Sequence, residues 1–142
     1  MYNRISYEEL VQLEKLTHDT VFLPLCQRMM AFMDFRNWNP LRFHLNTNLD
    51  MNTYSKLKNN HMKRPDMRTF IAICAGLRLP YHIIEDLLRS ARMTFSYSKE
   101  DQAYRYVVLI MHGASIDECN TFLREQGVPL LGSIACDERE SA

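Results

Sequence analysis

The stretch Thr47–Pro65, TNLDMNTYSKLKNNHMKRP, most constrains how this chain can fold. Asn48 can adopt the left-handed backbone conformation that a tight turn requires. Asp50 can cap the helix that follows, for which we expect the range Met51–Lys58. A short helix from Pro40 to about residue 46 is expected just before the turn. The stretch therefore predicts two short helices joined by a tight turn, the second followed by a polar, basic loop.

The composition of the whole chain favours helices over strands. Its 142 residues include only four Gly and five Pro, but nine Met. The apolar fraction of 46% is typical of a folded protein. A chain of this size buries roughly 70% of the surface that its unfolded form exposes, so it can fold without a metal or a disulfide. We predict an all-α fold in one compact domain.

Apolar residues at helical spacing, caps and prolines predict six further helices. The expected second helix begins at Asp19 or Thr20, carries an apolar stripe that includes Phe22, and ends before Asn37. The others are expected at Tyr7–Thr17, capped by Ser6 and Glu9; from Pro65 onward; from Pro80 onward; at Lys99–His112; and from Ser115, with Glu118 as its capping-box partner, to Gly127.

We divide the chain into an N-terminal helix (residues 1–20), a core (21–92), a C-terminal helical pair (93–127) and a tail (128–142). The tail ends in polar and charged residues and is expected to be frayed. The helical pair is expected to pack on the core or on a second copy of the chain. Its segment Tyr104–Met111 is apolar nearly all round, which favours a helix covered on more than one side.

From Leu49 onward the sequence LDMNTYSKLKNN, followed by PDMRTFIAICAGLRLPYHIIEDLL, resembles the helix-turn-helix domain of the Cro/CI-like (XRE) family of regulators. The resemblance covers about residues 21–90. The matching positions are Leu49, the polar quartet Asp50, Met51, Asn52 and Thr53, then Tyr54, Ser55, Lys56, Leu57, Asn59 and Pro65, and the segment from Phe70 to Leu79. The resemblance implies a five-helix core, sequence-specific DNA binding, a role in transcription regulation and binding as a dimer.

Several positions depart from the family pattern. Lys58 stands where the family prefers Glu, and Asn60 replaces the loop Gly, whose left-handed conformation Asn can adopt. Pro40 occupies the place of a Gln that often contacts DNA phosphate, and His44 the place of a small Ala. These departures favour an alternative interpretation, in which the fold is kept as a protein-interaction module, adaptor or antitoxin-like, without DNA binding.

If the stretch binds DNA, the exposed side of its second helix enters the major groove. Asn52 can pair with adenine, Lys56 can donate to guanine, and Thr53 and Ser55 can contact base edges or phosphate. The full set of candidate DNA-binding residues is Asn52, Thr53, Ser55, Lys56, Asn59, Lys63, Arg64 and Arg68. The three basic residues after the helix would neutralise phosphates without reading sequence. The alternative is that this polar helix face is solvent-exposed surface without a binding function.

The charges permit a local positive face but no global one. Seventeen basic and seventeen acidic residues cancel, so the chain has no net field to attract nucleic acid. From Arg42 to Arg68, however, six basic residues accompany two acidic ones. The aromatic residues around Trp38 are expected to wedge two helices together or, alternatively, to form an exposed patch for a protein partner.

No pattern predicts catalysis, a metal site or a cofactor. The chain has no P-loop, GxGxxG, GxSxG or HExxH motif, and Cys119 and His112 belong to different expected helices. The five histidines are scattered, and the four cysteines lack ligand spacing and are interpreted as reduced thiols. The start MYNRISYEEL lacks the layout of a signal peptide, and no run approaches the roughly 18 apolar residues of a membrane span. We therefore expect a cytoplasmic protein that is not an enzyme.

Overall fold

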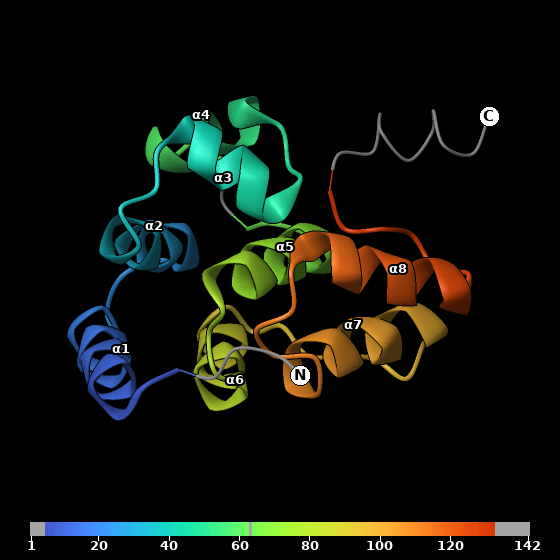
Figure 1. The fold of residues 1–142 in the computed structure, drawn as a ribbon. Coiled ribbons are helices and arrows are strands. Elements are labelled where there is room, and N and C mark those ends of the chain that lie inside the picture. The colour runs from blue at the N-terminus through green and yellow to red at the C-terminus, as the bar shows by residue number, and fades with distance from the viewer. Residues whose placement is uncertain (1–4, 63, 133–142) are drawn as a thin grey trace.

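The computed structural model describes residues 5–62 and 64–132, which form eight α-helices and no β-strand (Figure 1). The predicted all-α class is therefore confirmed for this part of the chain. The helices are α1 Tyr7–Asp19, α2 Leu25–Phe35, α3 Pro40–Thr47, α4 Met51–Lys58, α5 Met67–Leu77, α6 Tyr81–Ser90, α7 Lys99–Leu109 and α8 Ile116–Gln126.

Helix α5 is the centre of the fold. Its residues from 70 to 74 are all buried, and at about 100° per residue such a run covers every side of a helix. In Figure 1 the short helices α3 and α4 lie above α5, α7 and α8 lie to its right, and α1 and α2 to its left. Helices α2, α3, α7 and α8 all contact it. The C-terminal pair thus packs on the core.

Local side-chain caps fix where most helices begin. In each case a side-chain oxygen accepts a hydrogen bond from a backbone N–H in the first turn, which would otherwise lack a partner. The caps of this kind are Ser6, Asn39, Asp50, Asp66, Ser98 and Ser115. The predicted capping box of Ser115 and Glu118 is present. At α1, by contrast, the carboxylate of Glu9 contacts Arg36 at the end of α2.

The predicted start of the second helix at Asp19 or Thr20 is wrong. Helix α1 runs on to Asp19, and α2 begins only at Leu25, after Pro24. Proline disfavours helical geometry in the residue before it, so the intervening residues form a turn. Phe22, which the sequence placed on the buried stripe, is 96% exposed in that turn.

Two other boundaries differ by smaller amounts. Asp66 is the cap of α5, so the helix begins at Met67 instead of Pro65. Helix α7 ends at Leu109, not at His112. It packs on both α5 and α8, while its outer side, with Tyr106, Leu109 and Ile110, is exposed in the single chain.

The prediction of a frayed tail is wrong for its first five residues. Val128 and Leu131 are buried, and the hydroxyl of Tyr104 on α7 donates to the carbonyl of Pro129 at 2.8 Å. This segment runs back from the end of α8 toward the turn between α3 and α4 (Figure 1). Residues 133–142 of the predicted tail lie outside the described residues.

A buried arginine ties α1, α2 and α6 together. Arg28 of α2 is fully buried, and its Nη2 donates to the carboxylate of Asp86 at 3.0 Å and to the carbonyl of Thr17 at 2.9 Å. Its Nη1 donates to Ser90 Oγ at 3.1 Å, and its Nε to Thr20 Oγ1 at 3.4 Å. A buried guanidinium is tolerated only when its N–H groups have such partners. The N-terminal helix is therefore part of the core unit.

Replacing Asp86 by Asn should lower the free energy of unfolding by about 2 kcal/mol, because the buried charge of Arg28 would lose its carboxylate. Urea denaturation measures this effect. Arg89→Ala is the matched control: it removes an exposed pair with the same carboxylate at 3.7 Å and should cost less than about 0.5 kcal/mol. Equal effects of the two substitutions would contradict the assigned role of Arg28.

The buried phenol of Tyr104 makes the free energy of unfolding depend on pH in the alkaline range. Burial raises the pKa of Tyr104 to about 12, whereas a tyrosine in the unfolded chain titrates near its ordinary value of about 10. The folded state therefore favours the protonated phenol. Its contribution to stability is fully present below a pH of about 10 and is lost as the pH rises through 12.

We expect the free energy of unfolding to fall across this range, and Tyr104→Phe to make the fall shallower. Tyr97→Phe, at a side chain that is 99% exposed, should leave it unchanged. An equally steep fall in the Tyr104→Phe protein would show that the phenol is not responsible.

Candidate nucleic-acid interface

The turn between α3 and α4 is fixed by three hydrogen bonds, made by the side chains of His44 and Thr47. Asn48 is left-handed at φ 61°, as predicted. The ring Nδ1 of His44 lies 2.8 Å from the carbonyl oxygen of Leu49. The hydroxyl of Thr47 donates to the carbonyl of Phe43 at 2.7 Å and accepts from the N–H of Leu49 at 3.1 Å. The start of α4 is thus held in one orientation relative to α3.

The inner side of α4 is anchored in the core. Tyr54 and Leu57 are 6% and 1% exposed. The centre of the Phe43 ring lies 5.4 Å from that of Tyr54, in a tilted arrangement, and 6.1 Å from that of Trp38, in the edge-on arrangement typical of packed aromatics. Trp38 and Phe35 are half-buried against the core, so the aromatic residues wedge the helices together.

Gly76 on α5 lets α3 approach very closely. A Cβ atom at this position would lie 2.6 Å from the carbonyl oxygen of Asn46 at the end of α3. Only glycine avoids that collision without a backbone shift. Helix α3, on which α4 packs, therefore rests directly on the central helix.

The outward side of α4 brings together four of the predicted site residues. At about 100° per residue Asn52, Ser55, Lys56 and Asn59 share one side of the helix, opposite Tyr54. All four are exposed, and within the described part of the chain their side chains form no hydrogen bond. Their amide, hydroxyl and ammonium groups are donors that suit base edges and phosphates. We call these four residues the α4 face.

The remaining predicted residues lie elsewhere. Thr53 is half-buried on the flank of α4. Lys63 lies outside the described residues. Arg64 is exposed, and its Nη1 lies 3.4 Å from the carbonyl oxygen of Ala91, after α6. Arg68 is half-buried, with its Nε donating to the carbonyl of Leu130 in the C-terminal segment. The structure thus gives Arg68 a partner that the sequence did not indicate.

Two further exposed basic residues on α3 and α4 were not in the predicted set. Lys58 ends α4, and Arg42 lies on α3 with its Nη1 3.2 Å from the carbonyl oxygen of Asn37. Both belong to the basic cluster that the sequence does show between residues 42 and 68. The charge count, and not the motif, was the signal that could have found them.

Acidic groups also lie on or near α4. The carboxylate of Asp50 accepts a hydrogen bond from the N–H of Asn52 at 3.0 Å, so it occupies the positive end of the helix dipole. A groove of about 450 Å³ between α2 and α4 is lined by both Asp34 and Lys58. Burial and, secondly, the charge of Asp34 raise the pKa of Tyr54. The surface around the α4 face is therefore mixed in charge.

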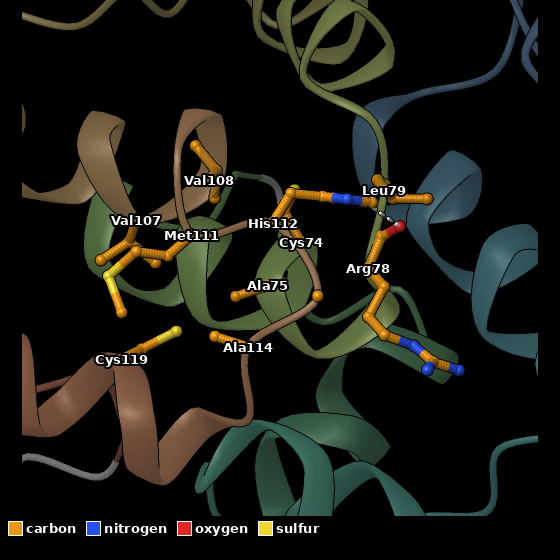
Figure 2. A pocket seen from close by; sticks show the side chains of 11 residues that line it. Cys74, Ala75, Arg78, Leu79, Val107, Val108, Met111, His112, Ala114 and Cys119 are labelled. Atoms are coloured by element: carbon orange, nitrogen blue, oxygen red, sulfur yellow. Dashed lines mark hydrogen bonds between the residues drawn. The ribbon is translucent and has the colours of Figure 1, made fainter. Parts of the chain in front are cut away.

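A separate small cavity between α5, α7 and α8 is lined by both Cys119 and His112, but the His112 side chain points away from Cys119 (Figure 2). Its volume is about 10 Å³, enough for one water molecule at most. The ring Nε2 of His112 lies 2.9 Å from the carbonyl oxygen of Arg78, the contact drawn in Figure 2. Burial raises the pKa of the Cys119 thiol to about 12, which keeps it protonated at neutral pH. This arrangement suits packing and not nucleophilic attack.

The other cysteines described by the structure are also packed in the core. Cys26 and Cys74 are each 1% exposed, and burial raises the pKa of both thiols. The thiol of Cys26 lies 3.0 Å from the carbonyl oxygen of Met62. Cys136 lies outside the described residues. These thiols fill space between helices, as small hydrophobic residues do.

Among residues 5–62 and 64–132, no helix has both the length and the apolar character needed to cross a membrane. No protein-family model matches the chain, and neither does any curated protein or solved structure.

Proposed function

We propose that the chain is a sequence-specific DNA-binding regulator that inserts the α4 face into the major groove. The observation that carries this proposal is the state of that face: four polar side chains are exposed on a helix whose inner side is anchored by Tyr54 and Leu57. In this proposal α2–α6 form a helix-turn-helix core of the Cro/CI-like kind, with α3 and α4 as its two motif helices.

Each residue of the α4 face has a distinct part in this interaction. Asn52 would pair with adenine through its amide, and Lys56 would donate to guanine O6 and N7. Ser55 and Asn59 would contact base edges or the sugar-phosphate backbone, with Thr53 at the flank. Phosphate neutralisation would fall to Lys63 and Arg64 after the helix, joined by Lys58 and Arg42. Arg68 would have to leave the carbonyl of Leu130 to take part.

We propose further that a second copy of the chain covers the outer side of α7. Tyr106, Leu109 and Ile110 are 43%, 37% and 56% exposed there. The ring of Tyr106 stacks on that of Phe122 from α8 at 4.7 Å. Exposed apolar surface of this kind marks an interaction site. A two-fold dimer would place two copies of the α4 face on half-sites about one DNA turn apart.

The alternative is a protein-interaction module, and one observation favours it. Leu41 and Leu45 on α3 and Met51 at the start of α4 are 56%, 63% and 46% exposed. These side chains are exposed on the same pair of helices and carry no group that contacts phosphate. The carboxylate of Asp50 and the zero net charge of the chain favour the same interpretation.

Binding to duplex DNA at several salt concentrations tests the proposal. The affinity should fall linearly with the logarithm of salt concentration, because phosphate contacts release counterions. Lys56→Ala should relax the sequence preference, at a cost of about 1–3 kcal/mol for the preferred duplex, whereas Arg64→Ala should weaken all duplexes alike and flatten the salt slope. Lys15→Ala on α1 is the control and should change neither.

An affinity that does not fall with salt, or no binding at low salt, would contradict the proposal. Leu45→Ser separates the alternative from it. This substitution should leave DNA affinity unchanged if the α4 face binds DNA, and should abolish partner binding if the apolar patch is the functional surface.

A further inference from the structure

We propose that the segment 128–132 is a strap that holds the α3–α4 turn against α8, with Asn120 and Gly132 as the residues that position it. Its effect on DNA recognition rests on the proposed function, but the strap itself does not. No sequence motif indicates it, and the chain folds back over the core to form it.

Successive main-chain groups of the strap are held by side chains from three different helices. The hydroxyl of Tyr104 on α7 donates to the carbonyl of Pro129 at 2.8 Å. The Nε of Arg68 on α5 donates to the carbonyl of Leu130. These side chains fix the path of an extended segment that belongs to no helix of its own.

Asn120 on α8 makes the most specific of these contacts. Its Nδ2 donates to the carbonyl of Leu131 at 3.0 Å, and its Oδ1 accepts from the N–H of the same residue at 2.7 Å. Asn120 is 7% exposed and Leu131 fully buried. An amide that satisfies both main-chain groups of one buried residue fixes that residue's orientation, and its loss would leave both groups without their partner.

The far end of the strap lies on the turn of the candidate interface. The Nδ2 of Asn48 lies 3.4 Å from the carbonyl oxygen of Leu131. A Cβ atom on Gly132 would lie 2.7 Å from both the carbonyl oxygen and the Nδ2 of Asn48. Gly132 also has a φ of 128°, which L side chains rarely adopt. Strap and turn can therefore lie this close only because residue 132 has no side chain.

The strap fixes α4 from outside its own motif. Asn48 sets the angle between α3 and α4, and the strap joins Asn48 to α8 through Leu131. If the turn were released from the strap, Lys56 and its neighbours would still be exposed on α4, so the attraction of α4 to phosphate would persist. Alignment with base edges would be lost first, because hydrogen bonds to bases need a fixed geometry whereas phosphate attraction does not.

The variant Gly132→Ala tests the strap, with Gly127→Ala as its matched control. Both glycines have positive φ, but a Cβ on Gly127 would meet nothing closer than the Nζ of Lys99 at 3.8 Å. Hydrogen exchange of the intact protein measures local opening at residues 48–54. In Gly132→Ala these amides should exchange about tenfold faster, while those of α1 and α6 keep their rates. Asn120→Ala should give the same local pattern.

DNA binding supplies a second readout that a general loss of stability would not produce. The affinity of Gly132→Ala for the preferred duplex should fall about tenfold, toward that for a random duplex, with the affinity for the random duplex unchanged. Unchanged exchange at residues 48–54 in both variants would overturn the strap, as would equal effects of Gly127→Ala. If the unaltered protein binds no duplex, the proposed function fails, and the exchange rates alone decide whether the strap exists.

Discussion

The burial of α5 on every side is the constraint on which the rest of the structure depends. No single neighbour can cover such a helix, so α2, α3, α7 and α8 all pack on it. Gly76 then brings the end of α3 within contact of the α5 backbone. The short helix α4, which has only eight residues, gains its orientation from this support and not from its own stability.

The sequence predicted those elements well that depend on interactions between residues close together in the chain. The bounds of α4, the left-handed Asn48 and the capping box of α8 are as the sequence indicated, because each depends on residues within one turn. The start of α2 was wrong because the apolar spacing of Phe22 suggested a helix, whereas the proline two residues later decided the backbone. Periodicity alone does not reveal which effect dominates at such a position.

The strap and the place of Arg68 were beyond sequence reasoning for a different reason. Hydrogen bonds from Tyr104, Arg68 and Asn120 to residues 129–131 join segments between 11 and 62 positions apart, and no local pattern encodes them. The apolar run Val128–Leu131 after the helix-ending glycine indicates that this segment can be buried, but not which side chains hold it. The exposure of the α4 face depends on spacing within one helix, so the motif predicted it. The partner of Arg68 lies 62 positions away, so the motif could not indicate it.

In the proposed function a polar helix face reads sequence on a chain without net charge, so base contacts should matter more than bulk attraction to DNA. Selection from a pool of random duplexes, followed by sequencing, tests this assignment most directly. We expect enrichment of a defined half-site that contains an adenine, and loss of the adenine preference in Asn52→Ala. A pool that stays random with the folded protein, or a motif unchanged by Asn52→Ala, would contradict it.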